Sequence, residues 1–213
     1  MRALLFASER VGSRLLIRAV GLFVLLLPPL VSPAADWAGL PDALRHGGYV
    51  LVMRHASSPR EIPERAAADP DNTTPERQLD EAGRRSAAAM GQALRQLRIP
   101  ITTVLSSPTY RARQTIRLAG LVLTRTVPEL GEGGASMQGA GAGQAEWLRQ
   151  QAALPPVAGN TLLVTHFPTI SAAFPQWART VEDGETLVLL PDGKGGTSLV
   201  ARIKIEEWPG LVP

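Results

Sequence analysis

Two of the three histidines in this chain end short apolar segments and have arginines close by. His55 comes directly after Arg54 at the end of one such segment, His166 ends another, and Arg111 lies just past a third. An imidazole can transfer protons near neutral pH or attack as a nucleophile. A lone histidine at the end of a strand is more often structural, but two of them with arginines nearby favour a functional pair. His46 lies in a polar stretch and is predicted at the surface.

The apolar segments before these residues have the composition of buried strands, and helical segments separate them. Asp80 is a suitable N-cap for the first long helix, Pro100 stops that helix, and Pro108 suits the start of the next one. We expect strands at 49–53, 101–105, within 121–127, and at 160–165, 185–190 and 198–205, and helices at about 81–97, 109–119 and 144–152.

This alternation predicts an α/β fold with three layers, α/β/α, around a mostly parallel central sheet. Ligands of such folds bind beyond the carboxyl ends of the strands. Arg54-His55, Ser106-Ser107 and Thr165-His166 each follow a predicted strand, so we expect them at one edge of the sheet. Two long connections, 56–78 and 128–143, are the loops expected to determine the substrate.

Several segments resemble the motifs of the histidine phosphatase superfamily, the phosphoglycerate mutase-like proteins. Residues 51–56 (LVMRHA) resemble its Arg-His-Gly signature, residues 105–115 (LSSPTYRARQT) its second segment, and residues 163–166 (LVTH) its third. Residues 79–84 (LDEAGR) are similar to the helix start found between the first two. The segments occur in the family's order, and the resemblance covers nearly all of 48–205.

The resemblance implies a phosphoglycerate mutase-like fold and a covalent phosphohistidine intermediate. His55 would be the nucleophile, and Arg54, Arg111 and His166 would bind the phosphate, with His166 also counted among the catalytic residues. The chemistry fits these roles, since a neutral imidazole can attack phosphorus and guanidinium groups bind phosphate oxygens in pairs. No cofactor and no metal ion is implied, and the three scattered histidines lack a zinc-binding spacing.

The leaving oxygen of a phosphoester needs a proton, which the family usually takes from an acidic residue near the pocket. Leu130-Gly131-Glu132 resembles the place where some members carry a Glu, so Glu132 is the candidate general acid. Glu129 and Glu185 remain alternatives. Phe167 follows the second histidine where acid phosphatases and phytases of the superfamily carry Asp, which argues against the phytase-like branch.

The first 34 residues have the layout of a secretory signal peptide: four arginines, an apolar run, and small residues before Ala34. We therefore expect two parts, a signal peptide at 1–34 and a histidine phosphatase domain at 35–213. The alternative is a retained membrane anchor. The 1–34 segment holds four of the 22 Lys and Arg and one of the 19 Asp and Glu, which leaves 18 of each. A neutral mature chain gives no indication of nucleic-acid binding.

The sequence thus predicts an exported phosphomonoester hydrolase that is metal-independent and periplasmic or secreted. The absence of cysteine in all 213 residues suits a periplasmic domain of this size. Expected partners are a phosphorylated small molecule or envelope component, with no nucleic acid and no membrane anchor after cleavage. Two alternatives stay open: a non-catalytic phosphate-binding domain, and a phosphotransferase of the phosphoglycerate mutase type. The sequence does not determine the physiological substrate or the oligomeric state.

Overall fold

The structure, a computed structural model, describes residues 39–132 and 141–213, so the predicted signal peptide lies outside the described residues. Six strands form one sheet in the order β3-β2-β4-β1-β5-β6. The strands β3, β2, β4 and β1 run parallel to one another. Strand β5 runs antiparallel to β1, and β6 runs antiparallel to β5. The strands are β1 (Val50–Arg54), β2 (Ile101–Ser106), β3 (Arg125–Thr126), β4 (Asn160–Thr165), β5 (Thr186–Pro191) and β6 (Thr197–Ile203).

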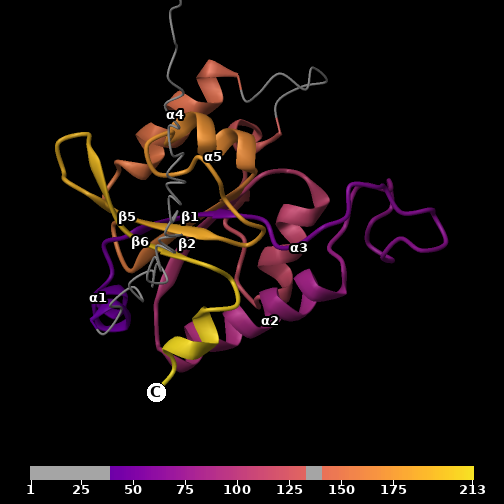
Figure 1. Cartoon of the computed structure of the whole chain (residues 1–213), viewed down its shortest axis with the longest axis horizontal. Helices are drawn as coiled ribbons and strands as arrows, with labels where there is room; N and C mark the ends of the chain where they lie inside the picture. The colour runs from indigo at the N-terminus through magenta and orange to yellow at the C-terminus, as the bar shows by residue number, and fades with distance from the viewer. Residues whose placement is uncertain (1–38, 133–140) are drawn as a thin grey trace, which may run out of the picture. The chain divides into compact units, whose positions relative to one another are not determined.

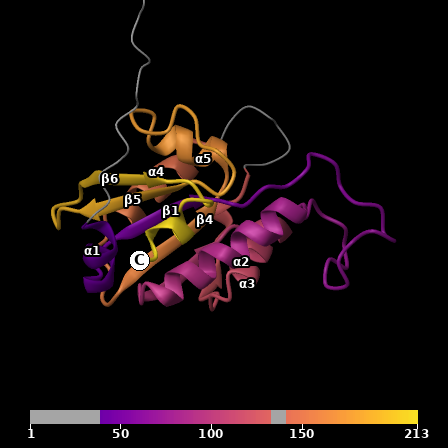
Figure 2. The same cartoon turned by 60° about the horizontal axis from the view of Figure 1, so that its bottom comes forward.

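Helices cover both faces of this sheet, as the sequence predicted (Figure 1). The helices are α1 (Leu40–His46), α2 (Glu81–Gln96), α3 (Tyr110–Leu118), α4 (Ala142–Ala152) and α5 (Phe167–Ala173), with 3-10 turns η1 (Pro128–Leu130) and η2 (Trp208–Leu211). Figure 2 shows α2 and α3 together on one side of the sheet and α4 and α5 on the other. The predicted three-layer α/β/α fold is thereby confirmed.

Strand β1 shows how the sheet separates two apolar cores. Leu51 and Met53 pack into the cluster that includes α2 and α3, and Val50 and Val52 pack into the cluster that includes α4 and α5. Successive side chains of a strand point to opposite faces, so a strand covered on both sides is apolar throughout. This explains why β1 and β4 appear in the sequence as continuous apolar runs.

Helix α2 begins where the sequence predicted it and also holds the loop after β1. The side chain of Asp80 accepts a hydrogen bond from the backbone N–H of Gly83 at 2.7 Å, which is a regular N-cap. Its other oxygen accepts from the hydroxyl of Ser57 at 2.6 Å. The cap therefore ties the chain just beyond His55 to the start of α2.

The sequence prediction differs from the structure at the shorter elements. The strand expected within 121–127 is only two residues long, because β2 pairs with it only at Leu105 and Ser106. Helices α1 and α5 were not predicted, although each has a proline in its first turn, where its missing N–H costs nothing. Part of the expected loop 128–143 is the turn η1, and part lies outside the described residues.

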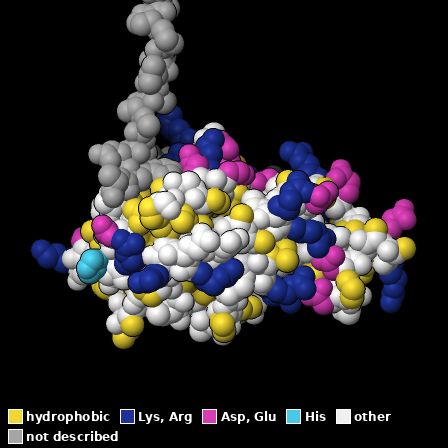
Figure 3. Space-filling model, turned by 90° about the horizontal axis from the view of Figure 1, so that it is seen from below, with side chains coloured by type: hydrophobic (Ala, Val, Ile, Leu, Met, Phe, Trp, Pro, Cys, Tyr) yellow, Lys and Arg dark blue, Asp and Glu magenta, His cyan; other side chains and the backbone are white. Residues whose placement is uncertain are grey.

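The surface carries charges of both signs. On the face seen in Figure 3, basic and acidic side chains are interspersed among uncharged ones rather than gathered into one patch. Among residues 39–132 and 141–213, no helix has both the length and the apolar content needed to cross a bilayer. His46 is exposed, as predicted.

Candidate active site

The register of the sheet brings the two candidate histidines together. Arg54 of β1 pairs with Thr165 of β4 in a parallel ladder, so the next residues, His55 and His166, leave the sheet at the same edge. The backbone N–H of His55 donates to the carbonyl of Thr165 at 3.1 Å and extends the ladder by one residue. The two imidazole rings lie 5.2 Å apart between centroids. Both rings are almost fully buried.

His55 is held in one tautomer by two contacts. Its Nδ1 lies 2.8 Å from the carbonyl oxygen of Ala56. A carbonyl oxygen can only accept a hydrogen bond, so Nδ1 carries the proton and donates it. Its Nε2 accepts a hydrogen bond from Nε of Arg111 at 3.2 Å, so this nitrogen carries a lone pair. Burial lowers the pKa of His55 well below its usual value, and the neighbouring side chains of His166, Arg111 and Arg54 act in the same direction. His55 is therefore a neutral imidazole whose Nε2 faces Arg111.

His166 is neutral as well, with its ring fixed from both sides. Nδ1 lies 3.2 Å from NH2 of Arg111 and accepts from it, so Nε2 carries the proton and donates to the hydroxyl of Ser107 at 2.8 Å. Ser107 follows β2 in the Ser-Ser-Pro segment, and its own N–H donates to the carbonyl of Val164 at 2.9 Å. Burial, followed by the charge of Arg111, lowers the pKa of His166 to about 3. His166 is thus a neutral hydrogen-bonding group and not a third cation.

Arg111 joins the candidate residues into one cluster. It lies in the first turn of α3, is 3% exposed, and contacts both histidines. Its NH2 also lies 2.5 Å from the carboxylate of Glu132. The backbone carbonyl of Arg111 accepts from the hydroxyl of Thr115, and that hydroxyl in turn accepts from the N–H of Ala56. Helix α3 and the segment after β1 are therefore fixed to each other at the site.

Arg54 is anchored by the segment before β5. Its NH1 donates to the carbonyl of Val181 at 2.7 Å, and its NH2 lies 2.5 Å from the carboxylate of Asp183. Its Nε is buried and has no hydrogen-bond partner among the described residues. Arg54 is close enough to lower the pKa values of both His55 and His166. An unpaired buried donor beside the histidines is available for an oxygen of a bound anion.

Of the three candidate acids, the structure places Glu132 beside His166. Its Oε1 lies 3.7 Å from Nδ1 of His166, and its side chain is 46% exposed. The turn before it is held by hydroxyl groups of the segment that carries His166: Thr165 donates to the carbonyl of Leu130 at 2.7 Å, and Thr169 to that of Gly131 at 3.2 Å.

The other two candidate acids lie differently. Glu185 is buried, and its carboxylate accepts from Arg202 at 2.7 Å and from the N–H of Glu182 at 2.8 Å. Its oxygens are thereby used in holding the segment before β5. Glu129 is half-buried on η1, and no ion pair of its side chain is recorded within the described part of the chain. Neither the Glu185 carboxylate nor the Glu129 carboxylate has a contact with His55 or His166 among the described residues.

One site residue, Arg77, was not identified from the sequence. Its Nε and NH2 donate to the carbonyls of Pro59 and Ser58 at 2.6 Å and 3.1 Å, while NH1 lies 3.8 Å from Oε1 of Glu132. Burial, and then the charge of Arg111, lower its pKa. Arg77 lies in a long polar loop with several other charged residues, so no local pattern distinguishes it. Only the path of the loop brings it to the site.

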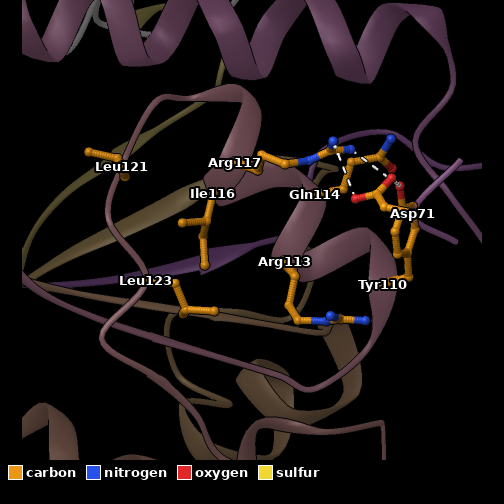
Figure 4. A pocket seen from close by; sticks show the side chains of 8 residues that line it. All are labelled: Asp71, Tyr110, Arg113, Gln114, Ile116, Arg117, Leu121 and Leu123. Carbon is orange, nitrogen blue, oxygen red and sulfur yellow. Dashed lines mark hydrogen bonds and ion pairs between the residues drawn. The ribbon is translucent and has the colours of Figure 1, made fainter. Parts of the chain in front are cut away.

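One hollow in the surface is separate from this cluster. It has a volume of about 310 Å³ and lies beside α3, between Arg113, Arg117 and the apolar side chains of Leu121 and Leu123 (Figure 4). Neither histidine lines it. Within residues 39–132 and 141–213 there is also no group of three or more His, Asp or Glu side chains arranged to hold a metal ion.

Comparisons with known proteins agree with this geometry. Residues 50–140 match the sequence model of the histidine phosphatase superfamily (branch 1). A comparison with curated protein sequences gave no match. The fold, together with the histidines and arginines at the edge of its sheet, defines the class of protein. It is a phosphoglycerate mutase-like α/β protein. Residues 50–140 are thus recognised as sequence of the histidine phosphatase superfamily, as their motifs predicted.

Several solved structures share the fold at low sequence identity. The protein histidine phosphatase SixA complexed with tungstate is 20% identical, with 74% of this chain and 97% of that chain covered and a TM-score of 0.54. A candidate phosphohistidine phosphatase SixA from Agrobacterium tumefaciens is 21% identical, with 73% and 97% covered and a TM-score of 0.51. Phosphoserine phosphatase from Entamoeba histolytica, in complex with 3-phosphoglyceric acid, is 10% identical, with 74% and 98% covered and a TM-score of 0.51.

Proposed function

We propose that this protein is a metal-independent phosphomonoester hydrolase that forms a phosphohistidine on His55. The observation that carries the proposal is the fixed tautomer of His55: its Nδ1 is bound to the carbonyl of Ala56, and its Nε2 lone pair faces Arg111. A buried, neutral imidazole with two guanidinium groups nearby is suited to attack a phosphoryl group and not merely to bind it. The match of residues 50–140 to the histidine phosphatase superfamily supports the same reaction class.

In the first step, Nε2 of His55 forms a bond to phosphorus while the bond from phosphorus to the ester oxygen breaks. Arg54 and Arg111 neutralise the charge on the equatorial oxygens, which is the main electrostatic requirement of phosphoryl transfer. Nδ1–H of His55 remains bound to the Ala56 carbonyl, which stabilises the positive imidazolium part of the phosphohistidine. The leaving oxygen takes a proton from Glu132, which enters this step in its protonated form and lies against Arg111 and His166.

In the second step, a water molecule attacks phosphorus and the bond to Nε2 breaks. Glu132, now ionised, accepts the proton of that water, so inorganic phosphate leaves and the site returns to its starting state. Since Arg111 contacts His55, His166 and Glu132, it stays close to the phosphoryl group in both steps.

The test is turnover of an aryl phosphate by purified protein in the presence of a metal chelator. Wild-type protein is expected to be active, and His55→Ala to lose at least about a thousandfold in kcat/KM. His46→Ala is the matched control, because His46 is exposed on α1, and it is expected to keep full activity. If no aryl phosphate is turned over and both proteins bind inorganic phosphate, the protein is a phosphate-binding domain and the proposal is wrong.

We also propose that the protein is exported and that residues 1–34 are removed. The basic, apolar and small-residue order of that segment supports this. N-terminal sequencing of protein recovered from its own cells is expected to begin at Ala35. Recovery of the protein with Met1 to Ala34 still attached would show a retained anchor.

A further inference from the structure

We propose that Arg202 of β6 is a positioning residue that acts through Arg54 and thereby sets the affinity of the site for a phosphoryl group. Arg202 has no contact with His55 or His166 among the described residues. Its role rests on the part of the proposed function in which Arg54 binds the phosphoryl group, and not on the bond from phosphorus to His55. The observation behind it is that one irregular segment, residues 177–185, contacts both arginines.

Residues 177–185 lie between α5 and β5, outside any helix or strand. The carbonyl groups of such a segment lack the regular backbone partners and need other donors. Arg202 supplies two: its NH1 donates to the carbonyl of Trp177 at 3.0 Å, and its NH2 to that of Thr180 at 2.6 Å. Its Nε donates to the carboxylate of Glu185 at 2.7 Å. All three nitrogens of one guanidinium group are thus bound to three points of the segment.

Arg54 depends on the same segment for the direction of its guanidinium group. NH1 of Arg54 donates to the carbonyl of Val181 at 2.7 Å, and NH2 lies 2.5 Å from the carboxylate of Asp183. Both acceptors lie within the stretch that Arg202 binds at each end. The remaining nitrogen, Nε, is buried without a partner among the described residues, and it is the donor left for a phosphoryl oxygen. The direction of Nε is therefore set by the segment that Arg202 holds.

Pairing in the sheet places the two arginines on one face. Arg202 pairs with Leu187 of β5, and Leu187 packs into the apolar cluster that includes α4 and α5. Val52 of β1 packs into the same cluster, and Arg54 follows two residues later, so its side chain lies on the same face. Strand β5 lies between β1 and β6. The segment before β5 can therefore contact both arginines at once.

Glu185 fixes Arg202 in its turn. Its side chain is 5% exposed, and a carboxylate buried to that extent needs a cation and hydrogen-bond donors. One oxygen accepts from Nε of Arg202, and the other accepts from the N–H of Glu182 at 2.8 Å. Arg202 cannot move away without leaving this buried charge unpaired, which keeps its two carbonyl contacts in place.

The experiment measures the dissociation constant of inorganic phosphate by calorimetry, which needs no turnover. The main variant is Arg202→Lys, because a lysine keeps the charge opposite Glu185 but has one nitrogen in place of three and cannot hold both carbonyls. We expect its dissociation constant to be about tenfold higher than that of wild-type protein. Lys204→Ala is the matched control, because Lys204 contacts the same segment through an exposed ion pair with Glu182 at 2.8 Å. It should change the constant by less than about twofold.

A double-mutant cycle with Arg54→Ala separates action through Arg54 from a general loosening of the site. In the Arg54→Ala protein, Arg202→Lys should change the dissociation constant by less than about twofold, since residues that act through one group are not additive. The role of Arg202 is wrong if Arg202→Lys binds phosphate as tightly as wild-type protein. It is also wrong if Arg202→Lys weakens binding equally with and without Arg54.

Urea unfolding shows whether each variant is folded under the conditions of the binding measurement. If Arg202→Lys is not, Arg202→Gln combined with Glu185→Gln removes both charges of the pair and gives the same comparison. A protein that shows this coupling and forms no phosphohistidine contradicts the reaction at His55 and leaves the role of Arg202 intact. If Arg54→Ala binds phosphate as wild-type protein does, both the binding role of Arg54 and the role of Arg202 are wrong.

Discussion

At the scale of single residues, the tautomers of two buried imidazoles define the site. Arg111 donates to Nε2 of His55 and to Nδ1 of His166, and a guanidinium group cannot accept. Both rings must therefore present a lone pair to Arg111 and hold their protons on the far nitrogen, against Ala56 and Ser107. One arginine thus fixes two tautomers, and the nucleophilic nitrogen of His55 is the one that faces the phosphate-binding groups.

This arrangement predicts that neither ring takes up a proton in the mildly acidic range. Burial lowers the pKa of His55 well below its usual value and that of His166 to about 3. In nitrogen-15 NMR spectra, the imidazole signals of both residues are expected to stay those of the neutral form between pH 7 and pH 5. A titration of either ring with a midpoint near 6.5 would contradict the proposed site.

Ser107 is expected to act as a positioning residue for His166. In Ser107→Ala, Nε2 of His166 loses its acceptor, while the buried cluster keeps its shape. We expect kcat/KM for an aryl phosphate to fall by about tenfold or more, since a buried donor left unpaired costs about 1–3 kcal/mol. Ser107→Thr keeps a hydroxyl group and should recover much of the loss, which a purely steric role of Ser107 would not allow.

At the scale of elements, the loop 57–78 is ordered by a polar network centred on Asp69. Its carboxylate accepts two hydrogen bonds from Arg84, each of 3.0 Å, and one of 3.0 Å from the hydroxyl of Tyr110. The same hydroxyl, with its single hydrogen, also lies 2.6 Å from the carboxylate of Asp71, and Arg117 contacts both Tyr110 and Asp71, as Figure 4 shows. The network joins the loop to α2 and α3. Arg77 is carried by this loop, so its position depends on contacts far from the histidines.

Loss of the Asp69 carboxylate should therefore lower the stability of the protein. For Asp69→Asn we expect a loss of about 1–3 kcal/mol in the free energy of unfolding, measured by urea, because charged hydrogen bonds are replaced by weaker ones. Glu61→Gln, at an exposed position of the same loop, is the control and should leave this free energy unchanged.

Helix α2 packs closely against the end of α3, and a glycine makes this possible. A Cβ at Gly91 would overlap the carbonyl of Ala119. Gly91→Ala should thus destabilise the protein, although alanine favours a helix by about 1 kcal/mol over glycine. Gln92→Ala, one residue along on the exposed face, should be nearly neutral. A more stable Gly91→Ala protein in thermal unfolding would show that the two helices separate easily.

The same elements show which features of the sequence were predictive. The α2 boundaries and the Asp80 cap were predicted because cap and periodicity are local signals. The pairing of His55 with His166 was predicted because parallel strands share an edge. Arg77, and the anchoring of Arg54 by Val181 and Asp183, were not, since they depend on how long loops return to the sheet. Helix α5 was missed because its short sequence carries little beyond its proline.

At the scale of the whole molecule, two buried neutral histidines couple stability to pH. Their pKa values in the folded chain are below those in the unfolded chain, so the unfolded chain binds more protons under acidic conditions. Their contribution to stability is therefore present above pH 6.5 and is lost as the pH falls. Between pH 6 and pH 5 we expect a loss of about 1 kcal/mol for each histidine. In His166→Asn the pH slope of the urea-unfolding free energy should be about half as steep, and an unchanged slope would contradict this.

The central claim is that phosphorus becomes bonded to His55. Protein mixed with an aryl phosphate and quenched in alkali within milliseconds, then digested and analysed by mass spectrometry, tests it directly. We predict one phosphoryl group on Nε2 of His55, stable in alkali, labile in acid and absent from His55→Ala. A phosphoryl group on any other residue, or full turnover with no labelled histidine at any time, would contradict the account.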